Sequence, residues 1–300
     1  MNTFQKKTNI LASAGLLATA VIWGFAFVVV KNSLDAVSPI YMLAFRFTIA
    51  VMVLAVIFAN RLKNLNKTLI IEGMVLGFLL FASYLVQTIG CKYTTAGKNA
   101  FLTTVYVVLV PFLHWAINKK KPNGYCITAA FMAITGIGFL SLQGDLSINI
   151  GDALTLICGL GFAFHMLYID RFTKQHDPVL LAVLQLFFAA IFSWVAALFG
   201  GGGFPQGAFT SPVVISMLYL GVFSSALGFL FQTVGQKYTS PSTTSLLLSL
   251  EAVFGVVFSI IFLDERLTGR MIAGCTLIFM AIIIAETQLD FLPVKKKEQV

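Results

Sequence analysis

Ten long apolar stretches follow one another along this chain of 300 residues, and they constrain its fold more than any other feature. A membrane-spanning helix needs about 20 mostly apolar residues. Transmembrane strands would alternate apolar and polar residues, whereas these stretches are continuously apolar. They lie near residues 10–30, 39–59, 68–89, 97–117, 125–142, 152–169, 179–199, 212–231, 243–263 and 270–287. The sequence therefore predicts an all-α integral membrane protein of about ten transmembrane helices, with little chain left between them for a soluble domain.

The composition argues against several other classes of protein. Hydrophobic residues make up 58% of the chain and charged residues 11%, whereas soluble domains carry about 25% charged residues. A soluble enzyme, a disordered protein or a nucleic-acid binder would need more polar residues than this. The four cysteines are scattered and form no C-x-x-C pair, so they predict neither a disulfide framework nor a metal site. We expect no cofactor.

The net charge of +8 is explained by membrane topology. Lys and Arg residues concentrate in the cytoplasmic loops of membrane proteins. If the N-terminus is cytoplasmic, most of the 20 Lys and Arg residues fall on that side, among them the run Lys119-Lys120-Lys121. We therefore expect a multi-pass protein of the cytoplasmic membrane with both termini in the cytoplasm, as an even number of spans requires. The charge does not indicate a nucleic-acid partner.

The chain contains an internal repeat. The third span ends in Gln87-Thr88-Ile89-Gly90-Cys91-Lys92-Tyr93-Thr94, and the eighth ends in Gln232-Thr233-Val234-Gly235-Gln236-Lys237-Tyr238-Thr239. Six of these eight positions are identical. A shorter match joins Gly24-Phe25-Ala26-Phe27 in the first span to Gly161-Phe162-Ala163-Phe164 in the sixth. We predict two five-helix repeats, residues 1–147 and 148–300.

An odd number of spans in each repeat forces the second copy to enter the membrane from the opposite side. The halves are then inverted repeats, an architecture typical of secondary transporters that bind substrate near the membrane midplane and alternate between two open sides. The other reading of the repeat is an ancient duplication kept only for packing. We favour transport over that reading.

Several motifs, taken in their order and spacing, resemble a known family. They are Trp23-Gly24-Phe25-Ala26-Phe27, Pro39 with Arg46-Phe47, the run from Lys92 to Leu102, Leu250-Glu251-Ala252-Val253 and Leu263-Asp264-Glu265-Arg266-Leu267. Together they resemble the EamA-type branch of the drug/metabolite transporter superfamily over essentially the whole chain. The resemblance implies a ten-helix carrier of small metabolites, often amino acids and often moved outward. One departure is Ala252, where the family often has proline.

Glu251 is the first candidate functional residue, because an ionisable side chain deep in a membrane is costly and usually faces the interior of the bundle. It lies about 13 Å along the ninth span, at 1.5 Å per residue. Its repeat counterpart, 145 residues earlier, is Tyr106. We predict a proton-coupling carboxylate or a partner for a substrate amine. The alternative is a structural Glu bonded to neighbouring hydroxyls such as that of Thr244.

Arg46 and Lys98 are the candidate cations. The guanidinium of Arg46 suits a carboxylate or phosphate, although a structural Arg that caps carbonyls or reaches outward is the favoured alternative. Lys98, followed by Asn99, opens the fourth span. Lys98 would point into a cavity if that helix begins before Thr94, and would be an interfacial cation if it begins at Gly97.

The remaining candidates are a buried histidine, a set of polar residues and a set of aromatic residues. His165 is either a proton relay or a neutral, hydrogen-bonded histidine. Polar side chains that could contact substrate are Tyr84, Gln87, Asn99, Thr103, Thr104, Tyr106 and Gln232. Aromatic side chains that could line a cavity are Trp23, Phe27, Phe101 and Phe164. Pro111 is expected to interrupt the fourth span and, with Gly97, to allow bending.

These features predict a secondary transporter of a small metabolite. The favoured substrate is an amino acid or a similar compound, and transport is expected to be coupled to protons or another ion. The alternative within transport is a multidrug, sugar or nucleoside efflux carrier. A membrane-embedded enzyme is remote, because the sequence has no H-E-x-x-H motif and no evident Ser/His pair. A channel is disfavoured by the inverted repeat. The expected partners are a small-molecule substrate and the lipid bilayer, and a monomer and a homodimer are equally compatible with the sequence.

Overall fold

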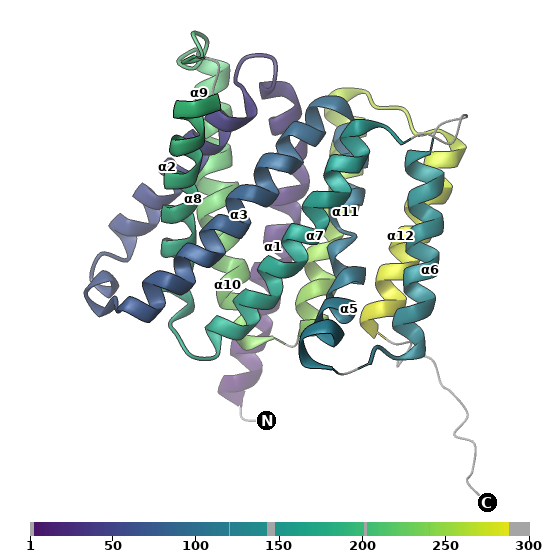
Figure 1. Ribbon diagram of the computed structural model, residues 1–300, viewed down its shortest axis with the longest axis horizontal. Helices are drawn as coiled ribbons and strands as arrows, with labels where there is room; N and C mark the ends of the chain where they lie inside the picture. The colour runs from purple at the N-terminus through teal and green to yellow at the C-terminus, as the bar shows by residue number, and fades with distance from the viewer. Residues whose placement is uncertain (1–2, 120, 143–147, 201–202, 240, 288–300) are drawn as a thin grey trace, which may run out of the picture.

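The computed structural model describes residues 3–119, 121–142, 148–200, 203–239 and 241–287, and this part of the chain is helical (Figure 1). The first repeat contains α1 (Thr3–Ser33), α2 (Pro39–Ile57), the short 3-10 helix η1 (Arg61–Asn64), α3 (Lys67–Tyr93), α4 (Ala96–Thr103), α5 (Tyr106–Asn118) and α6 (Gly124–Ser141). The second contains α7 (Ile150–Thr173), α8 (Pro178–Gly200), α9 (Ser211–Leu218), the π-helix η2 (Tyr219–Leu227), α10 (Gly228–Tyr238), α11 (Pro241–Leu263) and α12 (Gly269–Thr287).

These helices confirm the prediction of an all-α membrane protein of ten spans. Seven helical segments are long and apolar enough to cross a membrane, and three shorter apolar helices complete the set at α6, α11 and α12. The fourth span is α4 followed by α5, and the eighth is α9, η2 and α10 in succession. In Figure 1, α1 begins and α12 ends at the same end of the bundle, as an even number of spans requires. We call this the N-terminal end, and the other the opposite end.

The break in the fourth span does not lie where the sequence analysis placed it. Pro111 was expected to interrupt the helix, but it lies inside α5. The break falls between Thr103 and Tyr106 instead, where the Val105 amide reaches only the Leu102 carbonyl three residues back. Thr104 ends α4, and its hydroxyl donates to the Phe101 carbonyl at 2.9 Å. Its side chain thereby competes with the regular backbone ladder, as threonine commonly does.

The two repeats pack against each other through equivalent pairs of helices, which is the arrangement of an inverted repeat. Helix α1 packs along α11, and its counterpart α7 packs along α4 and α5. Helix α3 packs against α8, and η2, the counterpart region of α3, packs against α2. The last spans, α6 and α12, pack against one another at the side of the bundle (Figure 1).

Small residues allow the closest of these approaches. A Cβ atom on Gly136 of α6 would lie 2.9 Å from the Gly274 carbonyl oxygen of α12. A side chain at Gly274 would be just as crowded, because its Cβ would lie 2.8 Å from the Gly136 carbonyl oxygen. Helices in a membrane associate by such close packing, since lipid is as apolar as their side chains. The pair α6 and α12 therefore depends on glycine at both positions.

Candidate functional site

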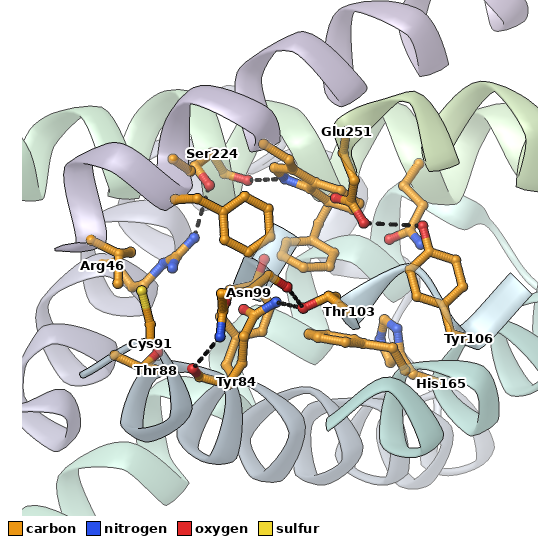
Figure 2. Close-up of a pocket in the computed structure, with 18 of the residues that line it drawn as sticks. Arg46, Tyr84, Thr88, Cys91, Asn99, Thr103, Tyr106, His165, Ser224 and Glu251 are labelled. Atoms are coloured by element: carbon orange, nitrogen blue, oxygen red, sulfur yellow. Dashed lines mark hydrogen bonds between the residues drawn. The ribbon is translucent and has the colours of Figure 1, made fainter. Parts of the chain in front are cut away.

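A cavity lies between the two repeats and is enclosed by α1, α2, α3, α4, α5, α7, η2, α10 and α11 (Figure 2). The empty space between its lining atoms, adjoining open space included, is about 590 Å³. The predicted candidates that line it are Trp23, Phe27, Arg46, Tyr84, Gln87, Asn99, Thr103, Tyr106, His165, Gln232 and Glu251. Most of the side chains proposed from the sequence, although far apart along the chain, are thus brought to one site.

Arg46 forms one wall of the cavity. Its side chain is 1% exposed, so it does not reach outward to the membrane surface. Its Nε donates to Ser225 Oγ at 2.9 Å and its Nη2 donates to Ser224 Oγ at 2.8 Å. The guanidinium carbon lies 4.5 Å from the centre of the Tyr84 ring, a distance at which a cation is attracted to the face of an aromatic ring. No carboxylate among the described residues pairs with it.

The π-helix η2 is what brings both serines to Arg46. A π-helix adds a residue to the turn and is frequently found at functional sites. Adjacent residues of an α-helix point about 100° apart, yet Ser224 and Ser225 both contact the same guanidinium. The backbone oxygen of Ser224 also accepts a hydrogen bond from Trp23 Nε1 at 2.8 Å. The irregular segment therefore joins Arg46 of α2 to Trp23 of α1.

Glu251 lies on α11 and is 4% exposed. Its Oε1 accepts a hydrogen bond from the Tyr106 hydroxyl at 3.1 Å. Thr244, a candidate partner in the sequence analysis, is bonded to Thr239 instead. Tyr106 and Glu251 are repeat counterparts, and counterparts that touch must lie close to the two-fold axis that relates the repeats. No basic side chain of the described residues pairs with Glu251.

Arg46 and Glu251 lie at about the same depth in the bundle. Arg46 is eleven residues from Ile57, which ends α2 at the N-terminal end, and Glu251 is ten residues from Pro241, which begins α11 at that end. At 1.5 Å per residue both are about 15–17 Å from that end. This is near the middle of a hydrocarbon core about 30 Å thick, the depth at which inverted-repeat transporters bind substrate.

Three polar atoms in the cavity have no hydrogen-bond partner among the described residues. They are Asn99 Oδ1, His165 Nδ1 and Gln232 Oε1, and their side chains are all nine-tenths or more buried. The other ring nitrogen of His165 does have a partner. His165 Nε2 lies 2.8 Å from Gln185 Oε1, whose amide donates to Thr233 at 3.0 Å. Because an unmet buried polar group costs free energy, these atoms are suited to contact a polar ligand.

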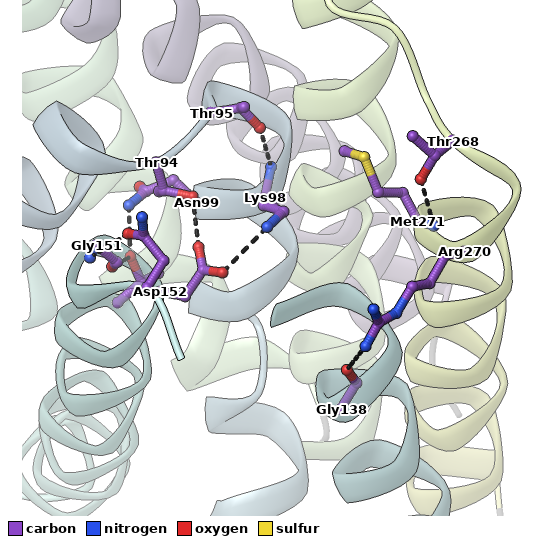
Figure 3. A network of polar contacts seen from close by, with 12 residues as sticks. Thr94, Thr95, Lys98, Asn99, Gly138, Gly151, Asp152, Thr268, Arg270 and Met271 are labelled. Atoms are coloured by element: carbon purple, nitrogen blue, oxygen red, sulfur yellow. Dashed lines mark hydrogen bonds and ion pairs between the residues drawn. The ribbon is translucent and has the colours of Figure 1, made fainter. Parts of the chain in front are cut away.

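Lys98, Phe101, Thr104 and Phe164 were also candidates, but they do not line the cavity. Lys98 Nζ lies 3.1 Å from Asp152 Oδ2 (Figure 3). Phe101 is buried in the core, and Phe164 is partly buried.

The N-terminus of α4 explains the position of Lys98. The helix begins at Ala96, between the two starts considered from the sequence. The Ala96 and Gly97 amides donate to the Glu265 carboxylate at 2.7 and 3.1 Å, and Asp152 also accepts from the Thr94 hydroxyl. Glu265, from the loop before α12, and Asp152, from the start of α7, therefore both hold the α3–α4 junction. Lys98 is part of that junction.

Sequence reasoning missed eight residues that line the cavity. They are Ala26, Val30, Thr88, Cys91, Phe162, Met166, Ser224 and Phe229. Phe162 lies in the repeated Gly-Phe-Ala-Phe run, from which Phe164 was chosen instead. Two residues turn an α-helix by about 200°, so the two rings lie on nearly opposite faces of α7. Ser224 and Ser225 are adjacent polar residues in an otherwise apolar span. That feature of the sequence could have indicated that this span contributes to the wall around Arg46.

Comparisons with known proteins agree with the fold. Residues 10–142 and 149–287 each match the EamA-like transporter family. An uncharacterized transporter of Archaeoglobus fulgidus is 34% identical over 281 residues, which cover 94% of this chain and 87% of that protein. A probable amino-acid metabolite efflux pump of Escherichia coli is 25% identical over 93% of this chain and 95% of that protein.

A solved crystal structure shares the fold. It aligns with a TM-score of 0.69 at 15% sequence identity, covering 93% of this chain and 98% of that one. Two family matches that together span most of the chain, ten apolar helices and a cavity between two inverted halves lead to the same assignment. The chain is a multi-pass membrane transporter and belongs to the EamA-like transporter family of the drug/metabolite transporter superfamily.

Proposed function

We propose that this protein exports a small zwitterionic metabolite, an amino acid or a similar compound, across the cytoplasmic membrane by alternating access. It moves its substrate without changing it covalently. The observation that carries the proposal is the pair of buried, oppositely charged side chains, Arg46 and Glu251, which line one cavity and pair with no charge among the described residues.

Each of these groups lacks a counter-ion, and a zwitterion would supply both. A charge inside a membrane protein is expensive unless it is paired. A substrate carboxylate would accept hydrogen bonds from Arg46, for which the planar guanidinium is well shaped. A substrate ammonium would pair with Glu251. A neutral sugar or nucleoside would leave both charges unpaired, which makes those substrates less favourable.

The direction and substrate class are supported by the name of the Escherichia coli relative, a probable amino-acid metabolite efflux pump, which matches this chain over most of its length. We propose both termini in the cytoplasm, as the distribution of Lys and Arg predicts. The run Lys295-Lys296-Lys297 and Lys120, which contribute to that prediction, lie outside the described residues. The repeat boundary between 147 and 148 adjoins residues 143–147, which are also outside them.

Glu251 is the proposed proton-coupling residue. Its carboxyl group lines the cavity, where it can either carry a proton or pair with a cation. A protonated Glu251 cannot pair with a substrate ammonium, so a proton and the substrate would compete for it. Inward movement of a proton would then drive outward movement of the substrate. Monomeric and homodimeric forms both satisfy this proposal, because each chain contains a complete cavity.

Counterflow in proteoliposomes tests the proposal. Purified protein is loaded with excess unlabelled compound, and uptake of the labelled compound is followed at two pH values for amino acids, a nucleoside, a sugar and a cationic drug. We expect saturable counterflow of an amino acid or similar zwitterion and none in liposomes without protein. Counterflow of only the cation or only the neutral compounds would contradict the proposal and favour a multidrug, sugar or nucleoside efflux carrier.

A further inference from the structure

The two unpaired charges of the cavity lie on opposite walls. Helix α2, which carries Arg46, packs against α3, α8 and η2, whereas α11, which carries Glu251, packs against α1, α4 and α12. Figure 2 shows the two side chains on opposite sides of the cavity, with ring side chains across the middle of the view. Since both charges are also at about the same depth, their separation is lateral.

The space between the charges is bounded by aromatic rings. The ring of Phe229 lies 5.1 Å from that of Trp23 and 5.9 Å from that of Tyr84, and Tyr84 lies 5.2 Å from Phe162. The indole N–H of Trp23 is used by the Ser224 carbonyl. Trp23 therefore presents only apolar surface to the cavity. Such rings offer large apolar surfaces that methylene groups can contact.

Each charged group is hydrogen-bonded to residues on its side of the cavity. Arg46 is held by Ser224 and Ser225 on η2, and Glu251 is bonded to Tyr106 on α5. No hydrogen bond or ion pair among the described residues joins the two groups. An α-amino acid carries its ammonium and its carboxylate on one carbon atom, whereas an ω-amino carboxylate carries them at opposite ends of its chain.

We infer that the substrate is a zwitterion whose ammonium and carboxylate lie at opposite ends of an apolar chain, as in an ω-amino carboxylate. The carboxylate pairs with Arg46, the methylene chain crosses the aromatic middle, and the ammonium pairs with Glu251. This inference rests on the proposed function and narrows it. A zwitterionic substrate satisfies the proposed function with either spacing of its charges, whereas the inference requires the wide spacing.

A pair of isomers separates the two ideas. 6-Aminohexanoate and 2-aminohexanoate have the same atoms and the same net charge, and they differ only in the distance between the charges. Each is used to compete for, and then to drive, counterflow in proteoliposomes of the full-length protein. We expect 6-aminohexanoate to have an apparent affinity more than about tenfold higher, because only it pairs with both walls and one charged hydrogen bond is worth about that factor.

Single-charge analogues test whether both walls are used. Hexanoate lacks the ammonium and hexylamine lacks the carboxylate, so both should compete more weakly than 6-aminohexanoate. In Arg46→Gln the advantage of 6-aminohexanoate over hexylamine should disappear, and in Glu251→Gln its advantage over hexanoate should disappear. Arg61→Gln is the matched control, because Arg61 lies outside this cavity and pairs with Asp177. Elution of each variant as a single species with unchanged helicity excludes misfolding.

The outcomes separate the inference from the proposed function. Equal or stronger binding of 2-aminohexanoate, with transport intact, would overturn the inference and leave the proposed function standing. Competition by hexanoate or hexylamine as strong as that by 6-aminohexanoate would also overturn it, because one wall would then suffice. If neither isomer nor any other zwitterion is bound, both the inference and the proposed function are wrong.

Discussion

The fourth and ninth spans are repeat counterparts, yet one is broken and the other is continuous. The fourth span stops at Thr103 and restarts at Tyr106, whereas α11 runs unbroken from Pro241 to Leu263. The reverse holds for the third and eighth spans, since α3 is regular and its counterpart contains the π-helix η2. The symmetric packing of the helices thus coexists with an asymmetric backbone at the cavity. The duplication explains why the two halves share one fold. The later divergence of the two copies explains why the cavity between them is asymmetric.

The divergence also determines which charges the cavity holds. Arg46 has the neutral counterpart Gln185, and Glu251 has the counterpart Tyr106. At the α3–α4 junction, Lys98 and Asp152 form a pair, whereas their counterparts are Thr243 and Gly15. Each charge therefore occurs in one repeat only. The following substitutions test the residues around the cavity and the α3–α4 junction one at a time, beginning with the one that should have the largest effect.

Asp152→Ala should have the largest effect, on stability. Asp152 is fully buried and neutralises Lys98, which retains some exposure to solvent. Removing one partner of a buried pair leaves an uncompensated charge, and we expect a cost of about 2–3 kcal/mol, reduced by that exposure. The midpoint of thermal unfolding in detergent should fall. Gly15→Ala, at the repeat counterpart, should leave it nearly unchanged, since a Cβ there meets only ordinary contacts with Phe231 at 3.6 Å. Equal effects of the two substitutions would contradict the claimed asymmetry.

Arg46→Lys should weaken transport while retaining the charge. Lysine cannot reproduce the planar fork that reaches Ser224 and Ser225 together. We expect the half-saturation concentration for a carboxylate substrate to rise about tenfold, which corresponds to about 1.4 kcal/mol. Concentration-dependent counterflow measures it, and Arg61→Lys outside this cavity should behave as the wild type. An unchanged half-saturation concentration in Arg46→Lys would show that any positive charge at this position binds the substrate carboxylate equally well.

Tyr106→Phe should have a smaller effect, because it removes a single hydroxyl. The phenol of Tyr106 donates a hydrogen bond to Glu251. One hydrogen bond to a charged group is worth about 1.5–3 kcal/mol. The loss is smaller where the carboxylate can bond to the substrate instead. We expect an altered pH dependence of counterflow with a maximal rate within about threefold of the wild type. Tyr125→Phe, on the partly exposed N-terminal turn of α6, is the control. Identical pH profiles in wild type and Tyr106→Phe would exclude a role for this contact.

Glu265→Gln should have the smallest effect. Glu265 accepts from two amides at the start of α4, where the helix dipole favours a negative charge. Glutamine keeps one acceptor and loses the charge, so we expect a loss of about 0.5–1 kcal/mol in stability. A small fall in the unfolding midpoint with unchanged substrate preference is the expected result. A change in substrate preference would mean that Glu265 acts on the cavity itself.

The sequence was sufficient to predict the ten helices and the inverted repeat, because burial in lipid imposes long apolar stretches and because the repeat motif is well preserved. It was also sufficient to choose most polar residues of the cavity, since few polar side chains occur in these spans. It could not locate the helix break, since the obvious signal, Pro111, lies inside α5 and the break depends on how Thr104 bonds.

Contacts between distant segments were also beyond the sequence. The partner of Lys98 is Asp152, 54 residues away, and nothing in their local sequences relates them. The choice of Phe164 over Phe162 failed because helical phase decides which ring faces the cavity. The π-helix was missed for a similar reason, because the Ser224–Ser225 pair acquires meaning only once Arg46 is known to lie opposite it.

The central claim is that a titratable Glu251 couples substrate to protons in the cavity, and Glu251→Gln tests it most directly. Counterflow and proton-gradient-driven transport of the zwitterion that gives the strongest signal are measured at two pH values in wild type and variant. We expect the variant to fold normally, to lose acceleration by the proton gradient and to show no change of counterflow with pH. Gradient-driven transport that keeps its rate and pH dependence in Glu251→Gln would contradict the account.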